Sequence, residues 1–282
     1  MARIPEGVNL DELTVVARRV LLDGLVTLET HLPAITVIGA QAVHLRSAGA
    51  SMRSAAYTSD GDLSIDPSRL ADDPHIDVML AEAGFAVVER QPGLWRKAEM
   101  VDGSEQQIEL DLLIGKTLID NVGRRSARKP PHDAMSFRWV EGIELACVDR
   151  SPMTIVALEP GDHRQVVVDV AGPTALLVAK AFKINDRVRG ADRFPDRLTN
   201  KDAGDVLRLM MTTPPAVVTA TLDQLRVDER VGEVTRTGER LLRELFGGRA
   251  ARGVDMAVEA LRGDVPEGRV RALAPAFVAA LD

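Results

Sequence analysis

The sequence predicts a mixed α/β domain over residues 1–170, followed by an all-helical domain over residues 171–282. Before Val170, short apolar runs rich in β-branched residues alternate with segments of helical periodicity, which is typical of strands and helices packed together. After Val170 no strand pattern remains, and glycine and proline separate one helical segment from the next. The 282 residues are enough for two domains that each bury a core of their own.

The predicted α/β domain begins with a helix and a buried strand. Residues 10–31 place apolar side chains at helical spacing, and Asn9 precedes them as an N-cap. Residues 34–39, AITVIG, form a short β-branched run stopped by glycine, which predicts a buried strand. A short helix follows and ends at Gly49. Residues 60–65, DGDLSI, then predict a second strand.

Further strands complete the predicted sheet before the helices begin. A helix that stops at Gly84 precedes a strand at residues 85–89, and the segments GLWRKAEM and QQIELDLLIG predict an antiparallel continuation. The runs MTIVAL and RQVVVDV predict two more strands. Helices are predicted at residues 173–185 and 202–211, and others follow up to the C-terminus.

Composition limits the class of protein. Cys147 is the single cysteine, so it forms no intramolecular disulfide, and the five histidines are too scattered for a zinc site. The chain does not begin with a basic stretch leading into an apolar run, and no apolar run approaches the roughly 20 residues of a membrane helix. We therefore expect a soluble, cytoplasmic protein that does not bind a membrane.

Two aspartates stand two residues apart in the segment TSDGDLSID. If this segment is a strand, Asp60 and Asp62 project to the same face. Carboxylates held that close raise each other's pKa unless a cation lies between them, and Mg²⁺ prefers such hard oxygen ligands. Gly61 between them lets a ligand approach closely. A simple Asp-Gly-Asp turn is the alternative explanation.

Three further features favour a binding site over a turn. Gly39 and Ala40 lie where a strand passes into a helix, and the free N–H groups of a helix start suit a triphosphate. Asp111 lies within an apolar run, where a metal-facing carboxylate, a general base, a salt bridge or an outward-facing position each account for it. A later apolar helix carries lysines, and the motif KDAGD follows it, either as functional groups or as a helix-stabilising pair. These residues are Lys180, Lys183, Lys201, Asp202 and Asp205.

The net charge of −7 argues against a protein coated in nucleic acid, but binding depends on local clusters. Two basic stretches occur, GRRSARKPPH and RVRGADRFPDRLTNK. Each is explained either as a solvated basic loop or as a contact for phosphates. Their cationic residues are Arg124, Arg125, Arg128 and Lys129 in the first, and Arg187, Arg189, Arg193, Arg197 and Lys201 in the second.

Together these motifs resemble the polymerase-β-type nucleotidyltransferase superfamily, and more specifically the AbiEii and MenT group of nucleotidyltransferase toxins from bacterial toxin–antitoxin systems. The shared pattern is a glycine and a small residue at a strand–helix turn, a DxD preceded by Thr or Ser, a carboxylate on a later strand, a helical lysine and a KDxxD motif. The resemblance covers roughly residues 35–210. The turn reads Gly39-Ala40 where the superfamily usually has Gly-Gly or Gly-Ser, and Ala56 stands where an arginine is expected.

The resemblance implies a polymerase-β-like core, with a mixed sheet flanked by helices, and a C-terminal helical domain that completes the active site and contributes to RNA binding. It implies transfer of a nucleoside monophosphate from a nucleoside triphosphate to RNA, in particular the 3′ end of tRNA, with release of pyrophosphate. Mg²⁺ or Mn²⁺ is the implied cofactor, and a cognate antitoxin is the implied partner. Blocked translation is the implied outcome.

The same resemblance implies roles for individual residues. The implied metal ligands and catalytic acids are Asp60, Asp62 and Asp111. Lys183 is assigned to the triphosphate, with Lys180 as the alternative, and Asp205 is expected to orient a lysine or the base. The implied nucleotide-binding residues are Gly39, Ala40, Thr58, Ser59, Lys180 and Lys183. The expected RNA-binding residues are Arg124, Arg125, Arg128, Lys129 and Arg189.

Three other functions fit the same residues. A small-molecule nucleotidyltransferase of the aminoglycoside-modifying kind uses the same core, and an acidic pocket suits a polycationic substrate. A phosphotransferase would pass the γ-phosphoryl group instead of the nucleotidyl group. A binding protein that keeps the fold without its chemistry is the third alternative, and the retained pair Asp60 and Asp62 argues against it.

Overall fold

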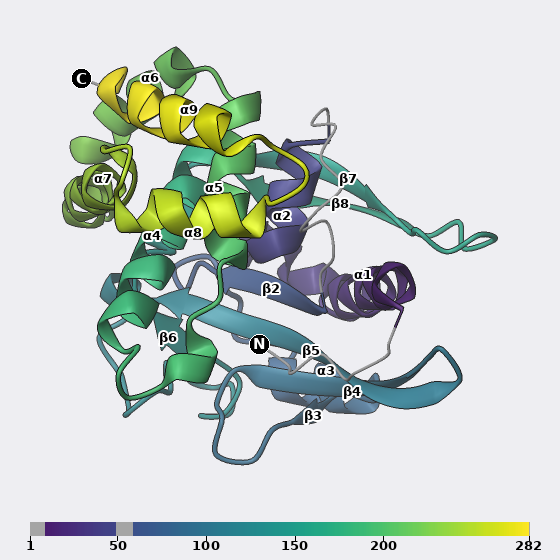
Figure 1. The fold of residues 1–282 in the computed structure, drawn as a ribbon. Helices are drawn as coiled ribbons and strands as arrows, with labels where there is room; N and C mark the ends of the chain where they lie inside the picture. The colour runs from purple at the N-terminus through teal and green to yellow at the C-terminus, as the bar shows by residue number, and fades with distance from the viewer. Residues whose placement is uncertain (1–8, 49–58, 282) are drawn as a thin grey trace. The chain divides into compact units, whose positions relative to one another are not determined.

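The computed structural model describes residues 9–48 and 59–281, and the chain forms two compact units (Figure 1). The sheet unit comprises the described residues of 1–42 and 57–140 together with Arg150–Ala171. The helical unit comprises the rest, from Gly172 onward and including the described residues of 43–56 and Glu141–Asp149. The change of unit after Ala171 lies next to the predicted boundary, but two earlier segments also belong to the helical unit.

The sheet unit contains a mixed sheet in the order β3-β4-β5-β2-β1-β8-β7, with β6 paired to β5. β2 runs parallel to β5, β5 to β6 and β1 to β8, whereas the other neighbours are antiparallel. The prediction of a mixed sheet flanked by helices is therefore confirmed. The strands are β1 Ile35–Ile38, β2 Asp60–Ile65, β3 Ala86–Val87, β4 Leu94–Val101, β5 Ser104–Gly115, β6 Arg138–Val140, β7 Arg150–Val156 and β8 Gln165–Ala171.

Helix α1, Leu10–Thr27, covers one face of this sheet, where it contacts β2, β4 and β5 (Figure 1). The predicted cap is confirmed, because the Asn9 side chain accepts hydrogen bonds from the N–H groups of Asp11 and Glu12. The helix is shorter than the predicted 10–31, and a 3-10 turn, Glu29–Ala34, leads from it into β1. Its apolar side buries leucines against the strands and thereby drives the packing.

Strand alternation gives the sheet two chemically different faces. Gly61 and Leu110 lie on the face covered by α1, where Gly61 approaches Leu21 closely. The residues directly before and after Gly61 and Leu110 point the other way, because successive side chains of a strand alternate. This second face, called here the polar face, carries Asp60 and Asp62 from β2 and Glu109 and Asp111 from β5.

Charges on the outer side of α1 hold two hairpins against it. Arg19 contacts Glu99 at the β4–β5 hairpin and Glu159 at the β7–β8 hairpin, at 3.0 and 2.6 Å. One turn further along the helix, Asp23 contacts Lys97 at 2.5 Å and also pairs with Arg164. The alternating charges at i and i+4 on the helix are thus matched by opposite charges on both hairpins.

The helical unit packs its helices pairwise, chiefly α4 on α7, α5 on α8 and α4 on α5. The segment Glu141–Asp149 joins it because the Asp149 carboxylate accepts the N–H of Ala175 in the first turn of α4, at 2.8 Å. None of the described helices combines the length and apolarity needed to cross a bilayer. The helices are α4 Pro173–Arg189, α5 Lys201–Thr212, α6 Pro215–Arg226, α7 Gly232–Phe246, α8 Arg252–Ala260 and α9 Glu267–Ala279.

Three histidines meet beside α3, Ile76–Glu82, in the sheet unit. The ring of His132 lies 5.8 Å from that of His31 and 5.9 Å from that of His75. Its Nδ1 accepts the N–H of Ile76 at 3.3 Å, so its Nε2 donates to the carbonyl of Ala71 at 3.0 Å. His132 is therefore held in its neutral form between two loop segments.

We predict that His132 makes folding sensitive to acid. Burial is the main cause that lowers the pKa of His132; the hydrogen bond to the Ala71 carbonyl opposes it, His31 and His75 lower the pKa further, and Asp77 opposes them least. The unfolded chain therefore takes up the proton first, and stability present above pH 6.5 is lost as the pH falls below that value. His132→Asn should lose about 1–3 kcal/mol at pH 8 but show a smaller further loss between pH 7 and 5.

Urea unfolding at four pH values measures this effect. His75→Asn is the matched control, because that ring is partly exposed and its removal should leave most of the acid sensitivity in place. Equal pH dependence in the wild type and the His132 variant would contradict the prediction.

Candidate functional site

The turn between β1 and α2, Gly39–Arg46, places a glycine directly against the second aspartate of the DxD pair. Ile38 pairs with Asp62 across the β1–β2 ladder, and Gly39 follows in a left-handed conformation with φ +72°. A β-carbon at Gly39 would lie only 1.9 Å from Asp62 Oδ2. The carboxylate of Asp62 therefore occupies space that only a glycine leaves free.

The parallel register of β2 and β5 brings the predicted acids together. Asp62 lies beside Asp111, and Asp60 lies beside Glu109, with all four side chains on the polar face. Burial, the negative charge of Asp62 and, less strongly, that of Asp60 together raise the pKa of Asp111 to about 7, against the opposing positive charge of Arg138. The three predicted acids therefore interact electrostatically, as expected for carboxylates that share a site.

Arginines from the neighbouring strands pair with acids of the polar face. Arg138 on β6 donates to Asp111 Oδ1 at 2.8 Å, so the salt bridge, one of the explanations left open by the sequence, is present. Arg96 on β4 pairs with Glu109 at 2.8 Å. On the other side of β2, Arg150 contacts Asp169 and Thr36.

Two of the carboxylates on the polar face, those of Asp60 and Asp62, suit a hard divalent cation. Asp60 and Asp62 supply carboxylate oxygens, and Mg²⁺ commonly takes one or two carboxylates and completes its shell with water and phosphate. Within the described ranges, no group of three or more His, Cys, Asp or Glu side chains is placed to hold a metal ion as it stands. Asp111 is engaged by Arg138, so its role as a third ligand stays a prediction.

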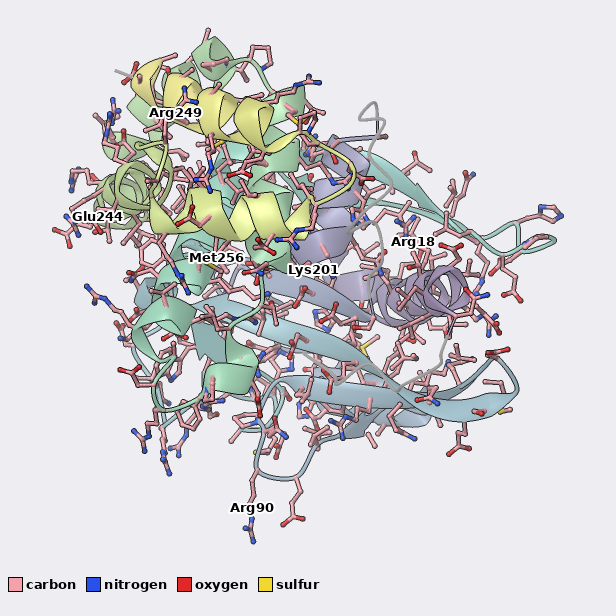
Figure 2. The ribbon with its side chains drawn as sticks, viewed as in Figure 1. Arg18, Arg90, Lys201, Glu244, Arg249 and Met256 are labelled. Carbon is pink, nitrogen blue, oxygen red and sulfur yellow. The ribbon has the colours of Figure 1, made fainter. Side chains whose placement is uncertain are left out.

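Two residues that the sequence analysis did not single out hold the start of β2. Arg18 projects from α1 (Figure 2). Its Nε donates to Gln41 Oε1 at 2.6 Å, and Gln41 Nε2 donates to the backbone carbonyl of Asp60 at 3.3 Å. Both side chains are buried, and burial lowers the pKa of Arg18. Two features of the sequence could have pointed to this link. Gln41 is the polar residue of the VIGAQA segment, and Arg18 lies on the buried side of an otherwise apolar helix.

The predicted lysines and the KDAGD acids meet within the helical unit. Lys180 Nζ lies 2.7 Å from both Asp202 and Asp205, and all three side chains are almost completely buried. Burial works against the charged lysine, but the two carboxylates outweigh it and hold the pKa of Lys180 above its usual value. Asp205 thus forms a buried ion pair with Lys180, and its Oδ1 has no hydrogen-bond partner among the described residues.

Lys183 occupies a different environment one turn along the same helix. Its side chain is 39% exposed and its ammonium lies 3.2 Å from Asp202, which also accepts from Arg187 at 2.8 Å. Burial would raise the pKa of Asp202, but Lys180, Lys183 and Arg187 outweigh it and hold that pKa well below the usual range. Of the two predicted lysines, Lys183 is therefore the one that solvent or a ligand reaches.

The remaining predicted residues divide between described and undescribed positions. Thr58 lies outside the described residues, whereas Ser59 and Ala40 are buried in the sheet unit. Their predicted contacts with phosphate stay predictions. Arg189 is exposed near the end of α4 in the helical unit.

The first basic stretch forms a loop attached to β6. Arg124, Arg125 and Arg128 are exposed, and Lys129 lies 3.6 Å from Asp72. An isolated bridge joins Ser126 to Arg138, and Trp139 donates its indole N–H to the carbonyl of Gly123 at 3.1 Å. The loop is thus anchored to the strand that also carries the partner of Asp111. The pattern of charge alone did not reveal this connection.

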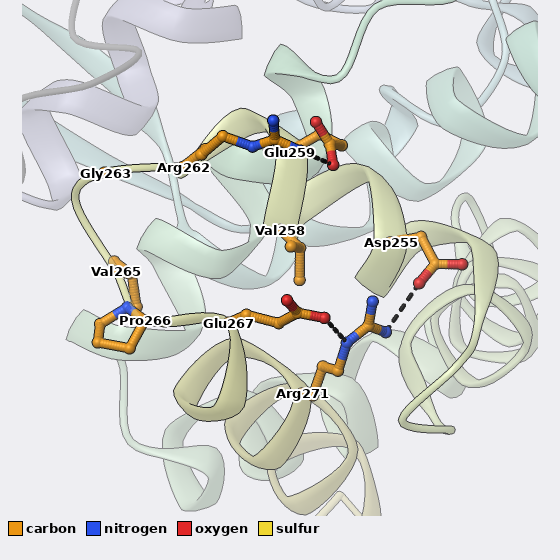
Figure 3. A pocket seen from close by; sticks show the side chains of 9 residues that line it. All are labelled: Asp255, Val258, Glu259, Arg262, Gly263, Val265, Pro266, Glu267 and Arg271. Carbon is orange, nitrogen blue, oxygen red and sulfur yellow. Dashed lines mark hydrogen bonds and ion pairs between the residues drawn. The ribbon is translucent and has the colours of Figure 1, made fainter.

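A pocket of about 490 Å³ lies in the helical unit between α8 and the start of α9 (Figure 3). Its charged walls are already paired, because Arg271 contacts Asp255 and Glu267, and Arg262 contacts Glu259. None of the predicted site residues lines it. The carboxylates of the polar face belong to the other unit.

Comparison of the chain with protein-family models, with curated proteins and with solved structures found no match.

We predict that Gly39→Ala displaces the Asp62 carboxylate. The left-handed conformation alone should cost about 1–2 kcal/mol of folding free energy, and the overlap of the new β-carbon with Asp62 Oδ2 should add to that cost. Gly84→Ala is the matched control, since Gly84 also has a positive φ, of 83°, but has nothing within 4 Å of the added carbon. Chemical denaturation of both variants measures the difference, and equal losses would contradict a carboxylate seated on Gly39.

We predict that Lys180 and Lys183 differ sharply in their contribution to stability. Lys180→Met leaves two buried carboxylates without their shared cation and should cost about 3–5 kcal/mol. Lys183→Met removes a partly exposed ion pair and should cost about 0–1 kcal/mol. Urea unfolding at pH 7 compares the two, and a small loss for Lys180→Met would contradict the buried triad.

Proposed function

We propose that this protein is a nucleotidyltransferase that transfers a nucleoside monophosphate from a nucleoside triphosphate to RNA, with the 3′ end of tRNA as the favoured acceptor. The proposal includes the role of a toxin that blocks translation and is neutralised by an antitoxin. It rests on the resemblance of the motifs to the AbiEii and MenT group and on the geometry of the sheet unit.

The juxtaposition of Asp62, Asp111 and Gly39 is the observation that carries the proposal. Adjacent parallel strands present carboxylates on one face, and the glycine that opens α2 lies against one of them. A simple Asp-Gly-Asp turn does not account for this arrangement, because Asp60 and Asp62 both lie within β2. Carboxylates beside a helix start are the groups that phosphoryl and nucleotidyl transfer require.

Each residue then has a defined task. A bound Mg²⁺ supplies charge neutralisation at the phosphates. Asp60 and Asp62 would hold that ion, with the Gln41 bond to the carbonyl of Asp60 keeping β2 in place. Asp111, paired with Arg138 in this structure, is the carboxylate that would accept the proton of the attacking hydroxyl as a general base. In the helical unit, Lys183 is the exposed lysine of the pair, and its binding of the triphosphate stays a prediction.

The basic loop supports an RNA acceptor rather than a small molecule. Arg124, Arg125 and Arg128 are exposed on a loop that is bonded to β6, and β6 also carries Arg138. Phosphate contacts from such residues provide affinity for RNA even when the net charge of the protein is negative. A polycationic substrate would gain nothing from these arginines.

Transfer of label from an NTP tests the proposal. The protein, with Mg²⁺, should move radioactivity from α-labelled but not γ-labelled NTP onto total tRNA. Asp60→Asn and Asp62→Asn should each lower the rate by about 10²–10³-fold or more, because transition-state charge loses its cation. Label on an aminoglycoside would favour the small-molecule reaction, and transfer of γ-label would favour a phosphotransferase.

Asp169→Asn is the matched control for the two acidic variants. Asp169 lies on the same face of the sheet but on β8, where Arg150 pairs with it. The proposal requires this variant to retain most of the transfer activity. Undiminished transfer by Asp60→Asn would count decisively against the proposed site.

A further inference from the structure

Close backbone packing around Gly93 fixes the position of Arg138. Gly93 has a positive φ of 73°, and a β-carbon there would lie 2.4 Å from the backbone N of Arg138 and 2.5 Å from the carbonyl oxygen of Leu112. Gly93 also accepts the N–H of Leu112 and donates to Met135. The start of β4, β5 and the start of β6 therefore meet at a glycine that has no room for a side chain. This packing delivers Arg138 to Asp111.

The contact between Arg138 and Asp111 uses only part of the donor capacity of the arginine. Among the described residues, one hydrogen bond joins the pair, from one terminal nitrogen of Arg138 to Asp111 Oδ1 at 2.8 Å. The guanidinium has five N–H donors in a planar fork that matches the oxygens of a phosphate. The Arg138 side chain is 20% exposed, twice the 10% of the Asp111 side chain. Further donors of the fork therefore remain for a ligand that reaches this side of the pair.

A divalent cation and Arg138 compete for the same carboxylate. Asp111 lies beside Asp62 in the β2–β5 register, so an ion held by the β2 aspartates lies next to the Arg138–Asp111 pair. Two positive charges close to one another repel, and a cation that recruits Asp111 weakens the hold of Asp111 on the arginine. The released guanidinium would then be able to bind a phosphate that the cation brings.

We propose that Arg138 is a phosphate-binding residue for the nucleotide, held on Asp111 until a divalent cation binds. This inference rests on the proposed function. Cation binding and nucleotide binding are then coupled through one side chain, and the coupling is reciprocal, because each ligand favours the state in which Arg138 has left Asp111. Without a cation the arginine neutralises a buried carboxylate, which also keeps the metal-free protein folded.

Two binding measurements that do not depend on turnover test the proposal. Free Mn²⁺ is followed by electron paramagnetic resonance, and binding of the α,β-methylene analogues of the four NTPs is followed by calorimetry with and without Mn²⁺. Arg138→Gln should tighten Mn²⁺ binding alone by about 5–10-fold, because the competing charge is gone. The same variant should weaken binding of the analogue in Mn²⁺ by about tenfold, through loss of a charge-assisted contact.

Matched variants separate this role from a structural one. Arg96→Gln removes the corresponding arginine from Glu109 on the same face and should change both affinities by less than about twofold. Asp111→Asn releases Arg138 without removing it, so the analogue should bind more tightly than to the wild type when no cation is present. This variant also tests the proposal if Arg138→Gln fails to fold.

Opposite changes for Mn²⁺ and the analogue in Arg138→Gln would support the proposal. Unchanged affinities, or a loss of both, would overturn it and leave Arg138 as a purely structural partner of Asp111. If the wild type binds neither Mn²⁺ nor any analogue, the proposed function itself fails. If the wild type binds both but the variants behave alike, only the role of Arg138 fails.

Discussion

Parallel, in-register pairing of β2 with β5 concentrates negative charge on one face of the sheet, and the neighbouring strands and the β1–α2 turn accommodate that charge. The pairing sets Asp60 beside Glu109 and Asp62 beside Asp111. Like charges at such positions destabilise a sheet unless they are compensated. Arginines from β4 and β6 compensate the two acids on β5, and Gly39 makes room for the carboxylate of Asp62. Charge and close packing thus occur together on the polar face of the sheet unit.

The two units handle buried charge in contrasting ways. In the helical unit, Lys180 is almost completely buried with Asp202 and Asp205, and both carboxylates pair with its ammonium at 2.7 Å. Such a cluster contributes to a unique packing of α4 on α5 but leaves little capacity for a ligand. On the polar face, by contrast, Arg138 only partly offsets its neighbours, since the pKa of Asp111 is still raised to about 7 by burial and by the charges of Asp62 and Asp60. An incompletely balanced cluster is the more suitable one for a cation.

The sequence predicted the strands and helices that carry strong local patterns. The β-branched run of β1, the DxD strand and the long α1 all occur near the predicted places, and Asn9 caps its helix as expected. The three-residue β6 was missed, because Arg138–Val140 has too few residues to show alternation. The sequence also left the role of Asp111 open. Its salt bridge could not be predicted, because the partner, Arg138, lies 27 residues away in the sequence. Lys180 and Lys183 lie one turn apart on one helix, so only tertiary packing distinguishes the enclosed lysine from the accessible one.

The hydrogen bond that Gln41 makes goes to the main chain of Asp60 and not to its carboxylate. Any residue at position 60 offers the same carbonyl oxygen, so the link from Arg18 through Gln41 survives every replacement of that side chain. The scaffold and the reactive group are therefore separable at this residue. A lineage descended from such a chain has a route to lose the acid, and whatever chemistry depends on it, while the strand stays anchored. At position 60, therefore, the fold can be inherited without the acid side chain.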